Sequence, residues 1–299
     1  MHINTKIGLQ GRYKLEVLNS SGESTRVIDW FDNLITDLGL DLLSGLCPGK
    51  GGNSLGAVIA PVCAVGTSAT SPLVSDTQLA ALVGSVGSPS DSSFVSVPNR
   101  RFEYQVTYTF PVGAATGNLS ELGVGWNATS LFSRALIKDG NGDPTTITVL
   151  ADESLRVTYE VWFNIPTGSF GDVVDGYTFA MKAANADGAG IPAPTDATMQ
   201  TVSGLYLYTG AVGATIDDQP GGSQAAQLTL LSGAYTLGSH TLQATAHAAL
   251  GIANADLAAM MWRQGPIPWQ SSITPVIAKD DTKILDITVA TSWAREGEL

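Results

Sequence analysis

The sequence predicts a mainly β protein, with antiparallel sheets in a sandwich or barrel-like arrangement and one or two short helices. Two long runs, from Phe102 to Phe110 and from Leu155 to Ile165, alternate apolar and polar side chains. This period of two is what a half-buried strand requires. Further short apolar runs are separated by turn residues at the spacing of an antiparallel sandwich or barrel. Only one stretch has the spacing of an amphipathic helix, so strands are expected to outnumber helices.

The first elements are predicted to be a hairpin and that helix. Residues 13–18 alternate in polarity, 19–22 supply turn chemistry, and 25–31 provide the returning strand. Behind the turn-friendly pair at 32–33, apolar residues at i, i+1, i+4 and i+8 predict a helix near residues 33–44. We expect this helix to pack on the sheet of the hairpin.

Further strands complete the first half of the chain. A Gly-rich loop at 45–56 precedes an expected strand at 58–65, and residues 76–83 are expected to be a short helical or irregular piece. Three more strands are expected between the two long alternating runs, at Leu119–Trp126, Leu131–Leu136 and Thr145–Leu150. Residues 1–166 are therefore predicted to form an N-terminal β-domain.

The second half has a different texture. Past Pro166 the chain becomes rich in Gly, Ala, Asp and Pro, which predicts a boundary and a β-rich C-terminal subdomain over residues 167–299. A loop is expected at 185–197 and a short helix at Asn254–Met261. Strands are expected at Val202–Tyr208, Ala226–Leu231, Thr241–His247 and Ile284–Trp293. Two arrangements fit this half, a second core or a return onto the first.

Charge and hydropathy restrict the class of partner. Fifteen Lys and Arg against 27 Asp and Glu give a formal net charge of -12, which repels phosphate backbones and anionic lipid, so we expect no nucleic-acid partner. No apolar run approaches the ~20 residues of a membrane helix, and the first twenty residues hold no signal-peptide pattern. We expect a protein that is made in the cytoplasm and does not insert into a membrane.

Catalytic and redox motifs are weak. Gly52–Gly56 matches the G-x-S-x-G spacing around Ser54, but a Gly-rich loop precedes it and an expected strand follows, which is not the strand–turn–helix context of a nucleophile. The spacing of Cys47 and Cys63 fits neither a zinc nor a redox motif, and we expect reduced thiols rather than a disulfide. The sequence therefore predicts no enzyme activity and no cofactor.

An acidic loop leaves two interpretations open. Asp139, Asn141 and Asp143 place oxygen ligands at alternate positions, as calcium loops do. Pro144 and Leu150 stand where an EF-hand needs Gly and Glu. A hairpin loop accounts for the same residues and is the favoured interpretation, with a cation site at the three oxygen-bearing residues as the alternative.

Tryptophans and sheet edges are the expected contact points. Trp30, Trp162 and Trp293 fall inside expected strands, whereas Trp262 and Trp269 flank a Pro-rich stretch where they could contact a partner. The interface candidates are Trp262, Trp269 and Trp293, the last because it lies in a terminal strand.

Low charge predicts self-association. Only 14% of residues are charged, below the roughly 25% of typical soluble domains. The runs 13–18 and 284–293 are expected to be sheet edges that a second subunit covers, and we therefore predict a homo-oligomer.

Several stretches have residue patterns that are more specific than the alternation of a β-strand. They are Gly11–Tyr13 with Trp30–Leu40, Cys63–Thr67 with Asp76–Leu79, Ser120–Gly125 with Leu131–Ala135, Leu155–Glu160, and Ile273–Lys279 with Ser292–Trp293. Together these stretches resemble a group of tailed-bacteriophage virion proteins usually described as tail or tail-fibre proteins. The likeness extends almost to the C-terminus.

The resemblance implies assembly into a virion, synthesis in the host cytoplasm, and other virion proteins as partners. It also implies no enzyme activity. Our leading hypothesis is a tail, tail-tip or fibre-associated structural protein. The alternatives are a capsid decoration protein and a carbohydrate-binding or adhesin module, the last favoured by the Trp and Tyr content.

Overall fold

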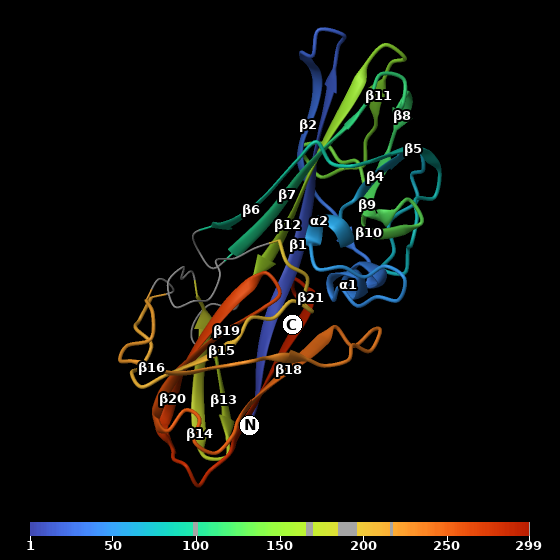
Figure 1. The fold of residues 1–299 in the computed structure, drawn as a ribbon. Helices are drawn as coiled ribbons and strands as arrows, with labels where there is room; N and C mark the ends of the chain where they lie inside the picture. Colours follow the sequence, from blue (N-terminus) through green and yellow to red (C-terminus); the bar gives the residue numbers. More distant parts are fainter. Residues whose placement is uncertain (98–100, 166–169, 185–195, 216–217, 299) are drawn as a thin grey trace.

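The computed structural model describes residues 1–97, 101–165, 170–184, 196–215 and 218–298. Strands dominate these residues and the helices are short, which confirms the predicted mainly β class with antiparallel sheets. Figure 1 shows an elongated molecule whose longest strands run along its long axis. None of the helices in the described ranges is both long and apolar enough to cross a membrane.

The largest sheet has eight strands and is the frame of the molecule. Its order is β17-β18-β21-β1-β12-β7-β6, with β2 pairing the second half of β1. The strands are β1 (His2–Leu18), β2 (Ser24–Asp32), β6 (Asp91–Val97), β7 (Arg101–Phe110), β12 (Ser154–Asn164), β17 (Leu231–Ser232), β18 (Thr241–Ala248) and β21 (Leu285–Arg295). β1 and β21 are parallel neighbours, so both ends of the chain contribute to one sheet. The boundary predicted at residue 166 lies outside the described residues.

Two further sheets and a strand pair cover this frame. A five-stranded sheet has the order β3-β10-β9-β4-β5, and a six-stranded sheet has the order β13-β14-β20-β19-β15-β16. In Figure 1 the five-stranded sheet lies with both helices beside the upper half of the long strands, and the six-stranded sheet lies at the lower end. Their elements are β3 (Leu34–Ile35), α1 (Asp37–Leu43), α2 (Leu55–Val58), β4 (Val62–Gly66), β5 (Leu82–Gly87), β9 (Glu121–Asn127), β10 (Ser130–Leu136), β13 (Phe170–Val174), β14 (Tyr177–Ala183), β15 (Leu205–Tyr208), β16 (Gln224–Leu228), β19 (Ala255–Gln264) and β20 (Ile267–Lys279), with β8 (Gly117–Leu119) and β11 (Ile147–Val149) as the pair.

Aromatic side chains fill the space between the frame and the five-stranded sheet. Alternate residues of β1, β7 and β12 point inward, as their period of two predicted, and are buried. The ring centroids of Tyr13 and Tyr159 are 4.7 Å apart. The hydroxyl of Tyr13 lies 2.6 Å from Ser133 Oγ, and Tyr108 donates to the carbonyl of Ala60. Each tyrosine thus adds apolar contact and a bond between layers. The core they begin is continuous into the six-stranded sheet.

Two predicted boundaries near the N-terminus were wrong. The helix expected near 33–44 begins only at Asp37, because Leu34 and Ile35 pair with β10 as β3. Thr36 then caps α1, accepting a hydrogen bond from the amide of Gly39 at 2.9 Å. The strand expected at 58–65 begins at Val62, since Val58 belongs to α2.

The helix expected at 254–261 was also wrong. This stretch is part of β19, which pairs with β15 on one side and β20 on the other. Residues 257–264 are buried on both faces, so the run shows no alternation. An apolar run without periodicity does not separate a buried strand from a buried helix.

The expected sheet edges proved to be interior strands. Residues 13–18 of β1 lie between β12 and β2, and β21 lies between β18 and β1. The outermost strands of the three large sheets are instead β17, β6 and the branching β2 in the first, β3 and β5 in the second, and β13 and β16 in the third. A surface that pairs with another chain must therefore be sought elsewhere.

Candidate functional site

Stretches that carry the resemblance come together around β9, β10 and α1. Glu121 opens β9, Arg134 lies in β10, and Asp76 lies in the loop between β4 and β5. The three belong to different stretches of the sequence, yet their side chains form one ion-pair network.

Arg134 and Glu121 are buried, Asp76 is half-buried, and nearly all donors of Arg134 are engaged in hydrogen bonds. Arg134 donates from Nε and Nη2 to Glu121 Oε2 at 3.0 and 2.7 Å, and from Nη1 to Asp76 Oδ2 at 2.6 Å. Its Nη2 also donates to the carbonyl of Thr70 at 2.8 Å. The Glu121 carboxylate accepts from the amides at 80–81 at 3.2 and 2.7 Å. The side chain of Arg134 is 2% exposed and that of Glu121 is 0%. A buried pair needs such extra bonds to offset desolvation, and here they fix the loop between β4 and β5.

A glycine allows α1 to sit directly on β10. A Cβ atom at Gly39 would collide with the carbonyl oxygen of Phe132, so only hydrogen fits. Thr36 strengthens the contact, because its hydroxyl donates to the carbonyl of Leu131 at 2.7 Å while it caps the helix. The backbones of α1 and β10 are therefore in direct contact.

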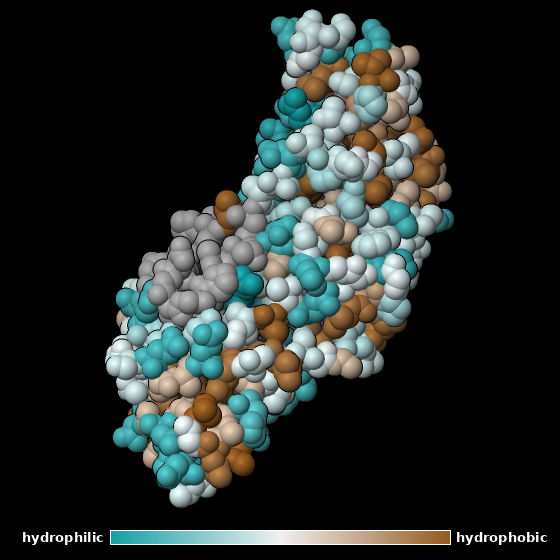
Figure 2. All heavy atoms as spheres, viewed as in Figure 1, coloured by the Kyte–Doolittle hydropathy of each residue, from teal (hydrophilic) through white to brown (hydrophobic). Residues whose placement is uncertain are grey.

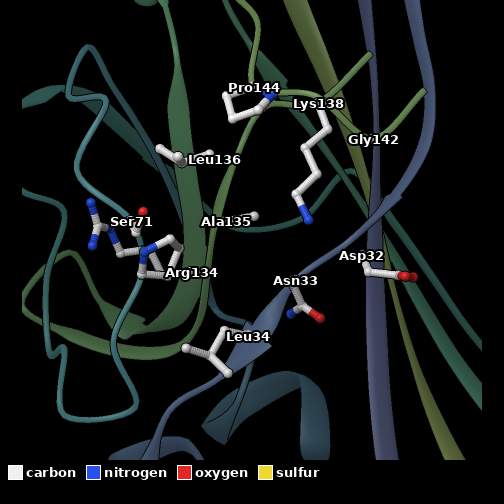
Figure 3. A pocket seen from close by; sticks show the side chains of 11 residues that line it. Asp32, Asn33, Leu34, Ser71, Arg134, Ala135, Leu136, Lys138, Gly142 and Pro144 are labelled. Atoms are coloured by element: carbon white, nitrogen blue, oxygen red, sulfur yellow. The ribbon is translucent and has the colours of Figure 1, made fainter. Parts of the chain in front are cut away.

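A cleft of about 300 Å³ opens at the far end of this unit. The pairing of β3 with β10 ends at Leu34 and Arg134, so the next residues of β10, 135–136, pair with β9 on one side and line the cleft on the other, where no described strand pairs with them. Figure 3 shows the side chain of Lys138 extending into the cleft toward Asn33, with the side chain of Asp32 to the right and pointing away. Within the described ranges Lys138 forms no ion pair.

A second hollow continues the first. It measures about 460 Å³ and lies across residues 32–34, where Gln10, Arg295 and Glu296 contribute to its walls. The two hollows together offer strand edge, apolar wall, one ammonium and several carboxylates. This mixture suits an extended polypeptide held by main-chain and side-chain contacts.

The serine of the G-x-S-x-G stretch has a carboxylate partner. Ser54 lies at the N-cap of α2, and its hydroxyl donates to Asp196 Oδ2 at 2.6 Å. His240 and His247 lie beside other carboxylates, Asp41 at 3.7 Å and Asp286 at 2.6 Å. The structure therefore does not place an imidazole on this serine.

The acidic loop has the geometry of a hairpin. Asp139 Oδ1 accepts from the amides of Asn141 and Asp143 at 2.8 and 3.1 Å, and Lys138 bridges to Pro144. One carboxylate of the alternative cation site is thus engaged by its own turn. Among the described residues, no three His, Cys, Asp or Glu side chains are grouped to hold a metal.

The three interface candidates are buried within the chain itself. Trp262 and Trp269 face each other across the hairpin of β19 and β20, whose turn contains Gly265 at φ 69°. Trp293 packs under Tyr235 with a centroid separation of 5.8 Å. The Pro-rich stretch is a tight turn between buried strands, and this fold leaves none of the three exposed to a partner.

Trp30 and Trp162 lie half-buried on the outer face of the large sheet. The Arg12 guanidinium stacks 4.3 Å from the ring centroid of Trp30 and 4.5 Å from that of Trp162, and Arg101 stacks 3.9 Å from Trp162. Arg12 also pairs with Glu160 at 2.6 Å. The arginines cover indole faces on which a sugar ring would stack, so this ladder works as a sheet-stabilising feature.

Both cysteines are free and buried thiols. Burial raises the pKa of Cys47 and, much further, that of the fully buried Cys63. Because the thiolate is the reactive form, a raised pKa lowers reactivity near neutral pH. At about pH 8 we expect iodoacetamide to leave Cys63 unmodified and to alkylate Cys47 slowly, with both modified at once in guanidinium. Mass spectrometry measures the sites, and rapid native labelling of Cys63 would contradict the packing described here.

Comparison of the chain with protein-family models, curated proteins and solved structures found no match. The residues that sequence reasoning missed are the Glu121–Arg134 pair and Lys138. A lone Glu and a lone Arg in runs otherwise composed of apolar, small or hydroxyl residues are a signal of buried pairing. Lys138 carried no such signal, because the cleft forms from segments distant in sequence.

Proposed function

We propose that the protein is a structural component of a tailed-bacteriophage virion, a tail, tail-tip or fibre-associated protein that assembles with other virion subunits. The observation that carries this proposal is the convergence of the resembling stretches. Glu121, Arg134 and Asp76 come from three of them, and Gly39 from a fourth, and all act in one packed unit. Chance similarity scattered along a chain would have no reason to converge in this way.

The cleft beside this unit supports a role in assembly. It offers the unpaired edge of β10 together with the ammonium of Lys138. An extended segment of a neighbouring subunit with an acidic side chain would add main-chain bonds to the edge and a charge-assisted bond to Lys138.

We expect the chain to be present in purified phage particles. Mass spectrometry of gradient-purified particles should find its peptides at a constant ratio to a major tail protein across the particle peak. Deletion of the gene should give particles that lack an intact tail or fibre. Abundant host proteins, which should decline through the purification, are the control.

The position of the protein in the particle separates the proposal from its alternative. Antibody labelling in electron micrographs should mark the tail or its tip. Labelling spread over the head would favour a capsid decoration protein. Absence from purified particles, or normal infectious particles without the gene, would overturn the virion proposal.

A further inference from the structure

One long stretch of the chain is almost free of charge. Between residues 51 and 99 the charged residues are Asp76 and Asp91. Asp76 is paired with Arg134, which it shares with Glu121. The rest of the chain therefore holds nearly all of the acidic excess that gives the formal net charge of -12. Residues 197–255 are similarly poor in charge, with Asp217 and Asp218 as their charged residues, so a surface formed by either stretch carries little charge of its own.

Strand β5 lies in this stretch and ends a sheet. It is the outermost strand of the five-stranded sheet and pairs with β4 on its inner side. In the portion of the chain that the structure describes, no strand pairs with its outer side. Its pairing with β4 is regular from Gly84 to Gly87, with one shift near Val83. The outer main-chain groups of β5 are thus left without a described strand as partner.

Apolar side chains surround this open edge. Leu82 is 52% exposed and Val83 is 40% exposed. The carbonyl of Ala114 packs against Gly84, and Val112, two residues before Ala114 in the chain, is 58% exposed. Figure 2 shows apolar residues along the upper right of the molecule, where Figure 1 places β5.

An open edge of this kind is usually protected in soluble proteins. Soluble proteins usually protect outer strands with lysine, proline, inward-pointing charge, a β-bulge or a very short strand, because an open edge pairs with other strands. Residues 82–87 contain none of these residues. The shift near Val83 is the one irregularity in the pairing of the strand.

We propose that β5 is a self-association edge, covered by β5 of a second copy of this chain in antiparallel pairing about a two-fold axis. The partner follows from charge. Two copies with a large acidic excess repel each other at most surfaces, and facing like charges disfavour a complex. The β5 edge allows two identical surfaces to meet without opposing acids and buries Leu82, Val83 and Val112 in the contact. Two-fold pairing of identical patches is the commonest form of self-association.

The biological role of this dimer rests on the proposed function. The pairing itself is a property of the isolated chain and can be tested without phage particles. Light scattering after size exclusion should show monomer and dimer in exchange as the full chain is raised from about 1 to about 100 µM. Val83→Lys should weaken the dimer at least about tenfold, because it places like charges in the contact. The matched control is Val173→Lys, which alters a 73% exposed valine on β13, an outermost strand of another sheet, and should leave the dimer unchanged.

A cross-link tests the geometry. Single cysteines placed in turn at residues 83–87 should yield a disulfide-linked dimer where the two-fold axis brings identical residues together. Val173→Cys should yield none, and the buried native thiols give little background. Circular dichroism of each variant should match the parent chain.

Each outcome decides the inference. A chain that stays monomeric at about 100 µM, or a dimer that Val83→Lys leaves intact, would overturn it. Presence in particles with a monomer in solution would refute the β5 contact alone. A β5 dimer with no chain in particles would refute the virion proposal alone.

Discussion

Replacing Arg134 with methionine is expected to lower the free energy of unfolding by about 3–5 kcal/mol, because it leaves the carboxylate of Glu121 buried without its counter-ion. The side chain of Glu121 is fully buried, so water does not replace the lost guanidinium. The backbone amides at 80–81 remain as donors but carry no full charge. Urea unfolding followed by circular dichroism measures the loss.

A second substitution tests the cause. In the double variant Arg134→Met with Glu121→Gln the stranded charge is gone, and the single glutamine oxygen still accepts from one of the two amides at 80–81, which bind different oxygens of Glu121. We expect the double variant to be less destabilised than the sum of the two single variants by at least about 1 kcal/mol. Additive losses would contradict the ion-pair explanation.

A surface pair provides the control. Arg156 lies 3.5 Å from Glu16, with its side chain 41% exposed. Arg156→Met should therefore cost no more than about 0.5 kcal/mol. Hydrogen exchange should also show faster exchange at Ala80 and Ala81 in Arg134→Met than in the control. Similar losses for the two variants would mean that Arg134 is not the anchor of the loop.

The part of the fold that the sequence predicted well is the part that alternates. Residues 102–110 and 155–165 each place one face in the core and leave the other mostly half-buried, so their pattern follows directly from strand geometry. The hairpin of β1 and β2 was equally readable, because turn residues separate its two strands.

The rest depends on contacts that distant segments supply. β19 is covered on both faces and shows no period, and β14 and β20 were not predicted because burial on both faces again removes alternation from much of their length. The prediction of the sheet edges was wrong for the same reason. Nothing in residues 284–293 indicates that β1 and β18 lie on either side of them. The ion-pair network was missed because Asp76 meets Arg134 only after the sheet has formed.

Trp293, one of the predicted interface residues, makes buried contacts with other parts of the same chain. Its indole nitrogen donates to the carbonyl of Leu40 at 2.8 Å, and its ring stacks on Tyr235. The same residue donates its amide to the carbonyl of His240 at 2.9 Å. One buried ring thus joins β21, α1 and the loop that carries Tyr235. Trp293→Ala should lower the free energy of unfolding by about 3–5 kcal/mol, through lost burial and the cavity that remains.

The milder Trp293→Phe separates packing from hydrogen bonding. Phenylalanine keeps a ring for Tyr235 but leaves the Leu40 carbonyl without its donor, which should cost about 1–3 kcal/mol. The control is Trp30→Phe on the outer sheet face. Trp30 is half-buried and makes one cation–π contact, so we expect this variant to lower the free energy of unfolding by only about 1 kcal/mol. Because Trp293 is interior, Trp293→Phe should leave self-association unchanged when measured by light scattering on the folded protein. A stable Trp293→Ala protein that no longer self-associates would place this tryptophan at the interface and contradict its packing against α1.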